Sequence, residues 1–458
     1  MMNWQQLLSA KRFGMEEYHD EKQHNRSDFQ RDYDRLIFSS PFRRLQNKTQ
    51  VFPLPGSVFV HNRLTHSIEV SSVGRSLGDM VGRMLKNKYS DYSVDFEDIS
   101  AIVAAACLAH DLGNPPFGHS GETAITSYFS EGRGSKKRIK VIENGEESTI
   151  SLKEAVEKEN GRWVDFERFE GNANSIRLLM HQFKGRRKGG FAMTYSMLAS
   201  IVKYPHASIA TNNSDKFGFF QSEEDSYKII ANSLGIICKS TDPLTFSRYP
   251  LVYLVEAADD ICYKIMDIED AHKLGLLSKE KTIELFLNFF PEEKQARMQN
   301  VLLRVSDTNE QIAYLRSSVI GLLVDECAKV FFNNEELILK GEFQGALIKH
   351  INALPRQAYK DATKISIEQI YKSRDVVDIE LAGHRIIGFL LDTFVDAILT
   401  PEANYSKLII NRIPEQYEVD SEFLYTRLLA VIDFISGMTD VYALDLYQKI
   451  TGLSLPTV

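Results

Sequence analysis

Apolar residues recur at helical spacing along most of the chain, and charged residues fill the positions between them. The stretch DFEDISAIVAAACLAHDL, residues 95–112, starts with acidic residues and is followed by Gly113, Pro115 and Pro116, which are start and stop signals of a helix. The same periodicity predicts further helices over 63–89, 171–183, 193–203, 249–274, 279–290, 309–333, 365–373, 376–398 and 421–452. The pattern therefore predicts a mainly α fold.

Two segments depart from the helical pattern. In KRIKVIENGEESTISLKEA, which begins at Lys137, apolar residues alternate on either side of Asn144-Gly145, and this predicts a small β-hairpin projecting from the helical body. The segment FKGRRKGGF, residues 183–191, concentrates basic residues and glycines. We expect a solvated loop there, and a contact to the phosphates of a nucleotide or a nucleic-acid strand is the alternative.

Length and charge limit the classes of function. The 458 residues suffice for one large domain or for two to three ordinary ones. The formal net charge of −8 argues against nucleic acid as a partner of the whole surface, because phosphate binding needs a basic footprint. A local basic patch stays open as an alternative.

Cysteine usage and hydropathy indicate a cytoplasmic protein. The four cysteines (Cys107, Cys238, Cys262 and Cys327) form no CxxC pair and have apolar neighbours, so we expect buried thiols in a reducing compartment rather than disulfides or a zinc ribbon. The longest apolar run, 99–109, is too short to span a bilayer. The N-terminal segment lacks the pattern of a secretory signal, so no membrane partner is expected.

Two histidines and two carboxylates are placed where predicted helices could bring them together. His66 lies early in one helix, His110 and Asp111 end a second, and Asp259 lies in a third. Such a mixed nitrogen and oxygen set suits a transition metal with positions left open for water and substrate. Each residue alone is explained as well by a hydrogen-bonded histidine, a pair at a helix C-terminus or a buried ion pair.

The third of these helices carries an unusual polar face. Asp259, Tyr263 and Asp267 follow one another at spacings of four residues, so they share one side of the helix. A carboxylate, a phenol and a second carboxylate make a poor core stripe but a suitable wall for a polar ligand. The arrangement predicts a sugar site, with the Tyr263 ring against the sugar and Asp267 accepting a hydroxyl.

Longer motifs around these residues carry a family resemblance. The H…HD…D order resembles the HD-domain metal-dependent phosphohydrolases, and the surrounding text is similar to bacterial dGTPase-like deoxynucleoside triphosphate triphosphohydrolases. The motifs are NRSDFQRDYDRLIFSSPFRRLQNKTQVFP, HNRLTHSIEV, HDLGNPPFGHSGE, RFEGNANSIRLL, YLVEAADDICYKIMDIEDA and MTDVYALDLY. Asn114 stands where the vertebrate branch has histidine, and the bacterial members share this asparagine.

The resemblance covers almost the whole chain and implies its architecture. It implies a single HD-domain enzyme over 1–458, with a helical HD core over about 50–275 and a C-terminal helical region over about 276–458 packed on it. No G-x-x-x-x-G-K-[ST] segment occurs in the sequence, so a P-loop is not the route to triphosphate recognition.

The resemblance also implies a reaction. Members of this family cleave a dNTP to a deoxynucleoside and inorganic triphosphate, through attack of water on the α-phosphorus. The four metal candidates would hold a divalent ion, Mn²⁺ or Mg²⁺. The motif places His119 to give a proton to the leaving 5′ oxygen, with Glu122 to orient His119 or raise its pKa, and the sequence leaves open which of the two handles the water and which the leaving group. Without the family resemblance, His119 is explained as a histidine that caps the start of the next helix.

Seven side chains are implied as substrate contacts: Gln50, Arg63, Asn172, Lys203, Tyr204, Tyr263 and Asp267. Arg63 and Lys203 would meet the triphosphate. Tyr263, packed under C2′, would exclude a 2′-hydroxyl, and Asp267 would accept the 3′-hydroxyl. Ordinary surface charges and turn residues are the alternatives for Gln50, Arg63 and the others.

The expected function is control of dNTP pools, with dGTP as the substrate because the family is named for it. A homo-oligomer (hexamer or tetramer), a dNTP activator at a subunit interface and a contact to single-stranded DNA are further expectations. Two competing functions remain. One is another HD-type nucleotide phosphohydrolase, and the other is a nucleotide-sensing or single-strand-binding protein supported by the basic loop 183–191.

Overall fold

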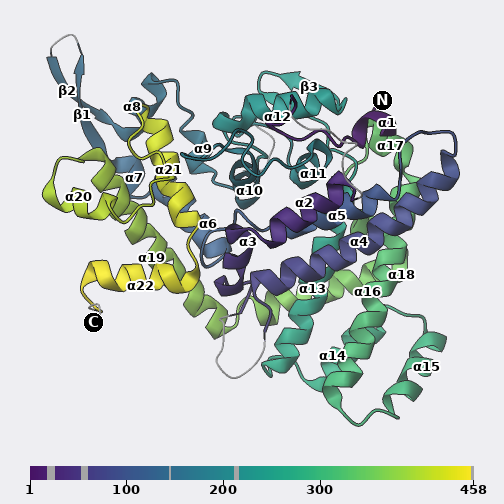
Figure 1. The fold of residues 1–458 in the computed structure, drawn as a ribbon. Helices are drawn as coiled ribbons and strands as arrows, with labels where there is room; N and C mark the ends of the chain where they lie inside the picture. The colour runs from purple at the N-terminus through teal and green to yellow at the C-terminus, as the bar shows by residue number, and fades with distance from the viewer. Residues whose placement is uncertain (18–25, 53–59, 144–145, 211–215, 455–458) are drawn as a thin grey trace.

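Helices dominate the computed structural model, which describes residues 1–17, 26–52, 60–143, 146–210 and 216–454 (Figure 1). The first part of the chain forms α1 (Trp4–Leu7), α2 (Asp28–Ile37), α3 (Ser40–Arg44), the 3-10 turn η1 (Leu45–Asn47), α4 (Arg63–Lys88) and α5 (Asp98–Ala109). The second part forms α6 (His119–Ser130), α7 (Arg133–Lys136), α8 (Leu152–Lys158), α9 (Val164–Glu167), α10 (Gly171–Met180), α11 (Tyr195–Ile201) and α12 (Gln221–Ser233). The mainly α prediction is confirmed.

The remaining helices follow residue 250. Those after residue 250 are α13 (Val252–Lys273), α14 (Lys279–Leu287), α15 (Glu292–Leu302), α16 (Thr308–Asn333), α17 (Glu335–Lys340), the 3-10 turn η2 (Leu347–Lys349) and α18 (Ala353–Ile365). They are followed by the π-helical turn η3 (Ser366–Ile370), α19 (Arg374–Leu399), α20 (Asn404–Ile410), α21 (Leu424–Ser436) and α22 (Asp440–Thr451).

Two predicted helices differ from the observed ones. The helix predicted over 365–373 instead begins at Ala353 and continues into the π-helical turn, so most of it precedes the predicted range. The single helix predicted over 421–452 is divided into α21 and α22. The division follows from local chemistry, because Thr439 caps α22 by accepting a hydrogen bond from the backbone N–H of Tyr442.

The predicted hairpin is confirmed. Strands β1 (Arg138–Glu143) and β2 (Glu146–Ser151) pair antiparallel, and they extend away from the helices in Figure 1. The predicted turn at Asn144-Gly145 lies outside the described residues. A second small sheet, β3 (Cys238–Thr241) with β4 (Leu244–Phe246), was not predicted, because strands of three or four residues show too little alternation.

A close contact between α4 and α5 forms the centre of the first hydrophobic core. Gly74, Gly78 and Gly82 lie one turn apart on α4 and face α5, where a Cβ on Gly78 would come within 2.8 Å of the Ser100 Cα atom. Helices that approach this closely leave no room for larger side chains. Because the two helices run antiparallel, the start of α4 meets the end of α5, and α13 packs against both.

A second hydrophobic cluster joins the middle of the chain to its C-terminal part. It contains buried residues of α6, α8 and α9 together with those of α19, α21 and α22. Helix α19 packs along α6 and against α21. The chain passes from the first cluster to the second between Leu112 and Ala124, so the polar residues of this segment lie between the two cores.

Hydrogen bonds from the C-terminal part fix the segments that enter this boundary. One oxygen of Asp440 accepts bonds from the backbone N–H and the hydroxyl of Thr49, at 2.7 and 2.6 Å. The other oxygen accepts from the backbone N–H of Phe117 at 2.9 Å. The buried Lys48 ammonium donates to the carbonyl of Asn114 at 2.6 Å. We call the three bonds to Asp440 the Asp440 clasp.

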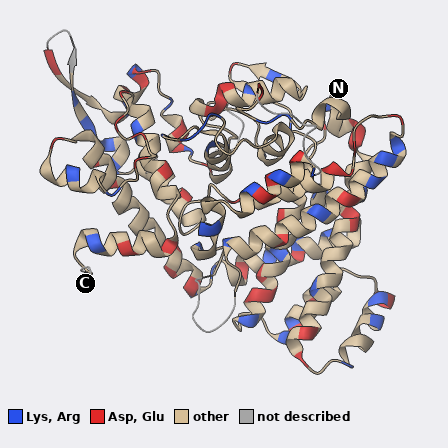
Figure 2. Cartoon of the chain, in the orientation of Figure 1, with Lys and Arg blue, Asp and Glu red and all other residues tan. Residues whose placement is uncertain are grey.

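The surface carries interspersed acidic and basic residues over most helices (Figure 2). The basic segment 183–191 is a loop, as predicted. Three cysteines are buried free thiols, whereas Cys238 is exposed at the start of β3, so the prediction of burial is wrong for Cys238. Within the described ranges, none of the helices has the length and apolar character needed to cross a membrane.

Candidate active site

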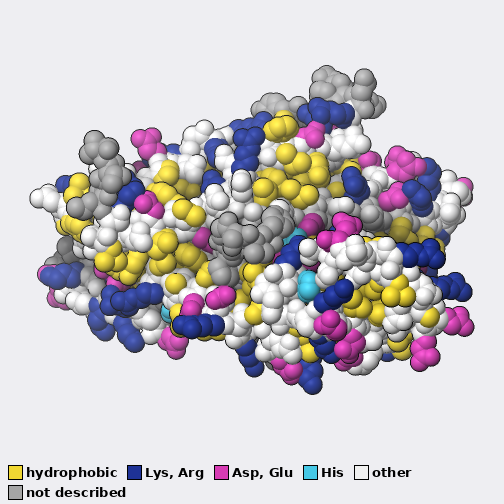
Figure 3. Space-filling model, turned by 90° about the horizontal axis from the view of Figure 1, so that it is seen from below, with side chains coloured by type: hydrophobic (Ala, Val, Ile, Leu, Met, Phe, Trp, Pro, Cys, Tyr) yellow, Lys and Arg dark blue, Asp and Glu magenta, His cyan; other side chains and the backbone are white. Residues whose placement is uncertain are grey.

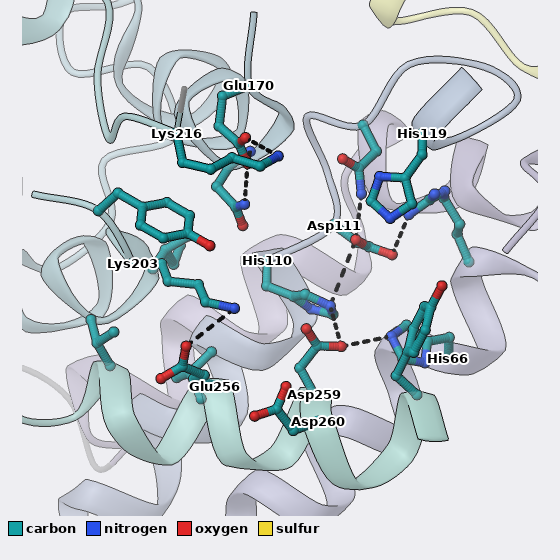
Figure 4. A pocket seen from close by; sticks show the side chains of 18 of the residues that line it. His66, His110, Asp111, His119, Glu170, Lys203, Lys216, Glu256, Asp259 and Asp260 are labelled. Carbon is teal, nitrogen blue, oxygen red and sulfur yellow. Dashed lines mark hydrogen bonds and ion pairs between the residues drawn. The ribbon is translucent and has the colours of Figure 1, made fainter. Parts of the chain in front are cut away.

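One cavity of about 420 Å³ gathers the predicted site residues at the boundary between the two cores. Its walls come from α4, α10, α11, α13 and α18, from the end of α5 and from the start of α6. Figure 4 shows the side chains converging from these elements. All the predicted site residues line this cavity except Asp267.

Three of the four predicted metal ligands form a tight buried cluster. The nearest ligand atoms of His66, His110 and Asp111 lie within 4.8 Å of one another. The fourth, Asp259, places Oδ1 at 3.2 Å from His66 Nε2 and at 3.6 Å from His110 Nε2. The structure thus brings together two imidazoles and two carboxylates from three helices, α4, α13 and the end of α5.

Local sequence explains why these side chains converge. Helix α4 begins with a capping box in which Asn62 and Thr65 satisfy each other's backbone groups, and this fixes His66 in the first turns. Helix α5 is almost entirely apolar and ends at His110. The close glycine contact between α4 and α5 then holds the two histidines side by side, with ring centroids 5.5 Å apart.

The chemistry of the cluster fits a divalent metal ion. His110 Nδ1 donates to the carbonyl of Cys107 at 2.6 Å, which leaves Nε2 as the nitrogen that faces Asp111 and Asp259 and would bind a metal on losing its proton. This Nε2 is buried and has no hydrogen-bond partner in the part of the chain that the structure describes. Although burial opposes it, the carboxylates of Asp111 and Asp259 raise the pKa of His110 to about 9, so the cluster attracts positive charge.

Asp111 is held in place by two donors. Arg63 donates to one oxygen at 2.7 Å, and Asn114 donates to the other at 2.5 Å. Burial alone would raise the pKa of Asp111, but the positive charges of Arg63, His110 and His66 together keep that pKa below its usual value. The contact also shows how Asn114, the residue after HDLG, acts: it orients a predicted metal ligand.

His119 and Glu122 form a pair at the start of α6. Their side chains lie 2.9 Å apart, and the second oxygen of Glu122 accepts from the backbone N–H of Gly171 at 2.8 Å. The hydrogen bond to Glu122 raises the pKa of His119. The His119 side chain is 73% exposed, so it combines a fixed orientation with access to the cavity mouth. A histidine held in this way, with its pKa raised, is suited to donate a proton.

Two lysines face this pair from the other side of the cavity (Figure 4). Lys203 lies 3.2 Å from Glu256, and Lys216 pairs with Glu170. Burial lowers the pKa of a lysine, but the carboxylates raise the pKa of both Lys203 and Lys216 above the usual value. Both side chains therefore stay charged at the cavity wall, where an anionic ligand can meet them.

Comparison with known proteins shows the family of the chain. The chain is 37% identical to a deoxyguanosinetriphosphate triphosphohydrolase-like protein of Synechocystis sp. over 99% of this chain and 100% of the relative. It is 36% identical to a protein of the same description from Pseudomonas aeruginosa over the full length of both. The chain belongs to the deoxyguanosinetriphosphate triphosphohydrolase-like family. A deoxyguanosinetriphosphate triphosphohydrolase of Yersinia enterocolitica is 30% identical over 92% of this chain and 93% of its own.

Two family models match separate parts of this family member. The HD domain matches residues 63–185, which contain His66, the 110–122 segment and Asn172. The phosphohydrolase-associated domain matches residues 355–449. The second range supplies Tyr359 to the cavity and Asp440 to the clasp. As an HD-domain protein of this family, the chain is a hydrolase, and it contains a His/Asp cluster that could hold a divalent metal.

Of the predicted sugar contacts, Tyr263, Gln50 and Asn172 line the cavity of this dGTPase-like chain, whereas Asp267 does not. Tyr263 lines the cavity, and its ring centroid lies 6.2 Å from that of His66. Gln50 also lines it, with a buried side-chain oxygen that finds no partner among the described residues. Asp267 lies one turn beyond Tyr263, is 5% exposed, and accepts a bond from Tyr371 at 2.5 Å. Asn172 donates to Glu170 at 2.5 Å.

Several lining residues of this family member escaped the sequence prediction: Asn114, Glu170, Lys216, Glu256, Asp260, Lys264, Tyr359 and Thr363. Glu256 and Asp260 carried a usable signal, because they lie four residues apart on the helix of Asp259. Lys216 and Tyr359 carried none, because they reach the cavity from segments whose placement depends on tertiary packing.

Proposed function

We propose that this family member hydrolyses deoxynucleoside triphosphates, with dGTP as the first candidate, to a deoxynucleoside and inorganic triphosphate. The observation that supports the proposal is that a metal-competent cluster, a histidine hydrogen-bonded to a glutamate, and two lysines line one cavity. The names of the relatives supply the class of substrate. Mn²⁺ and Mg²⁺ both suit the nitrogen and oxygen donors. The activity would lower dNTP pools in the cytoplasm.

In this reaction water attacks the α-phosphorus and the bond from phosphorus to the 5′ oxygen breaks. The departing 5′ oxygen needs a proton, because an alkoxide is a poor leaving group near neutral pH. His119 is the donor in this proposal, since its bond to Glu122 favours the protonated imidazole. Glu122 is itself fixed by Gly171, so it keeps the imidazole pointing in one direction.

The cations of the cavity offset the charge of the triphosphate. Lys203 and Lys216 would bind its outer phosphates, and Arg63, buried beside Asp111, adds a third positive charge near the cluster. A divalent ion held by His66, His110, Asp111 and Asp259 would withdraw negative charge from the reacting phosphate. Tyr263 would pack under the deoxyribose and exclude a 2′-hydroxyl.

Self-association and regulation form a second part of the proposal. Leu381 on α19 and Val441 on α22 are 65% and 62% exposed, and apolar side chains gather in several patches on the face seen in Figure 3. Such side chains favour self-association. The proposed assembly is a homo-oligomer, a tetramer or a hexamer, with a dNTP activator at a subunit contact. Single-stranded DNA would bind the basic loop, where Arg186 and Arg187 line a hollow of about 350 Å³.

Product analysis tests the proposal. The purified protein is incubated with Mn²⁺ and each dNTP singly, then with dNTPs in pairs, and the products are separated by anion exchange. Deoxynucleoside with intact triphosphate is the expected result, and turnover seen only in pairs would add nucleotide activation. Monophosphate with pyrophosphate would point to another HD-type hydrolase. No turnover with any mixture would favour the nucleotide-sensing alternative.

A further inference from the structure

The backbone just before His119 has an unusual conformation. Phe117 has a φ of +61° and Gly118 a φ of +59°, so two consecutive residues lie in the left-handed region, and α6 begins at His119. Glycine adopts this region freely, but a bulky aromatic residue there is a conformational outlier. Such a residue persists only where the surrounding structure holds it, and outliers of this kind cluster at active sites. Contacts from other parts of the chain must therefore hold Phe117 in place.

The first of these contacts is the Asp440 clasp. Oδ1 of Asp440 accepts the backbone N–H of Phe117 at 2.9 Å. Oδ2 accepts two donors from Thr49, at 2.7 and 2.6 Å. Asp440 is 8% exposed and lies in the first turn of α22. Because donors engage both oxygens, the carboxylate cannot rotate without breaking a bond, and the oxygen that faces Phe117 stays in one place.

Helix α19 supplies the other contacts. A Cβ on Gly383 would lie 2.6 Å from the Cβ of Phe117 and 2.8 Å from its Cγ, so the aromatic side chain occupies the space that a larger residue would fill. The hydroxyl of Ser120 donates to the carbonyl of Glu380 at 2.6 Å. Helix α19 and most of α22 lie in the phosphohydrolase-associated range. This range thus holds the chain on both sides of His119.

These contacts bear on the direction of the His119 imidazole. Because each residue has only two soft backbone dihedral angles, a change of φ at Phe117 would swing the start of α6. Glu122 is held separately, by the backbone N–H of Gly171 at 2.8 Å. The 2.9 Å contact between His119 and Glu122 therefore depends on the backbone before α6 staying where it is.

The metal cluster is held by different contacts. Neither Asp440 nor Phe117 lines the cavity. Asp111 is fixed instead by donors from Arg63 and Asn114, at 2.7 and 2.5 Å. Loss of the clasp should therefore disturb the proton donor and leave the affinity for a divalent ion nearly unchanged.

We propose that Asp440 is a positioning residue, which holds Phe117 in the left-handed conformation so that His119 points at the departing 5′ oxygen of the substrate. The proposal rests on the proposed dNTP hydrolysis and adds the residue that orients its proton donor. The phosphohydrolase-associated range would thus take part in proton transfer without Asp440 touching the substrate.

The test uses two substrates that differ in their need for a proton. One is the best dNTP, and the other is its analogue with sulfur in place of the bridging 5′ oxygen. In both, water attacks the α-phosphorus and the bond to the 5′ atom breaks, but a thiolate leaves without a proton because thiols are far more acidic than alcohols. In Asp440→Ala we expect kcat for the dNTP to fall about 10–100-fold and kcat for the sulfur analogue to change by less than about threefold. The affinity for Mn²⁺, measured by equilibrium dialysis, should stay close to that of the wild type.

Two substitutions of Phe117 isolate the left-handed conformation. Phe117→Gly and Phe117→Ala both remove the ring, but only glycine adopts a positive φ without cost. In the Asp440→Ala background, kcat for the dNTP should be about tenfold higher with glycine than with alanine at position 117. With Asp440 intact, the two variants should differ by less than about threefold, because the clasp then supplies the hold.

A second pair of variants serves if Asp440→Ala does not fold. Gly383→Ala forces the main chain of Phe117 to move, because the added Cβ would lie 2.6 Å from the Cβ of Phe117. Gly388→Ala, on the same helix, is the matched control, because its added Cβ would meet nothing within 4 Å. Gly383→Ala should lower kcat for the dNTP but not for the sulfur analogue, and Gly388→Ala should change neither.

The outcomes separate this inference from the proposed function. Equal losses on both substrates in Asp440→Ala or Gly383→Ala would show a purely structural role and overturn the proposal. Equal kcat values for glycine and alanine at position 117 in the Asp440→Ala background would overturn it as well. If the wild type hydrolyses the dNTP, such results refute the role of Asp440 alone. A wild-type protein that hydrolyses no dNTP refutes the proposed function and this inference with it.

Discussion

The contact between α4 and α5 makes a sharp prediction for Gly78→Ala. A Cβ at Gly78 would lie 2.8 Å from the Cα atom of Ser100, 3.0 Å from the carbonyl oxygen of Ile99 and 3.1 Å from the Ser100 nitrogen. All three are backbone atoms of a helix, so none can turn away as a side chain would. The two helices must separate, and overpacking of this kind costs about 1–3 kcal/mol.

A control substitution at a second glycine separates the cost of the clash from the gain in helix propensity. Alanine favours a helix over glycine by about 1 kcal/mol, and this gain applies to Gly78→Ala as well. Gly321 lies inside α16, and an added Cβ there would meet nothing within 4 Å. Gly321→Ala therefore gains the same helix propensity without the clash. The free energies of unfolding of the two variants should differ by about 1–3 kcal/mol, with Gly78→Ala the less stable.

Urea unfolding followed by far-UV circular dichroism measures the difference, with midpoints and slopes compared between the two variants and the wild type. A second readout is Mn²⁺ affinity. His66 and His110 come from the two helices that must separate, so Gly78→Ala should bind the ion more weakly, whereas Gly321→Ala should not. Equal stabilities of the two variants would refute the reasoning, because they would show that α4 and α5 do not touch as closely as described.

Three further predictions concern the cavity. Asp111→Ala should lose the bound divalent ion and all turnover, checked by metal analysis of the purified variant; retained metal at full rate would contradict the cluster. Glu122→Gln should shift the alkaline fall of kcat to lower pH, because the bond that raises the pKa of His119 is lost and the protonated donor disappears earlier as pH rises. A pH profile like that of the wild type would remove His119 as the acid. Tyr263→Ala should relax discrimination against GTP by about 10–100-fold in relative kcat/KM, and persistent rejection of GTP would place the sugar gate elsewhere.

Local signals in the sequence predicted the elements that carry their own start and stop residues. Helix α5 combines acidic residues at its start with glycine and prolines after its end, and the hairpin β1–β2 alternates on both sides of its turn. The helix predicted over 365–373 was misplaced because nothing in its composition marks a π-helical turn. The exposed Cys238 shows the same limit, since apolar neighbours in sequence do not determine which side of a short strand faces solvent.

Spacing along one helix could predict part of the site, and packing between helices determined the rest. Tyr263 and Asp259 were predicted because they share one face of α13. The engagement of Asp267 by Tyr371 was not, because the two residues are 104 positions apart and meet only through the turn after α18. Lys216 was missed because a single lysine carries no periodicity.

The Asp440 clasp has a consequence for how an active molecule is made. Thr49 and Asp440 are 391 positions apart, yet one carboxylate holds both the approach to Gln50 and the loop that carries Asn114. A ribosome has therefore translated nearly all of this chain before Thr49 and the loop after the HD segment receive these restraints. Nascent chains would contain every cavity residue from the HD range before Asp440 is available to hold Thr49 and the loop of Phe117.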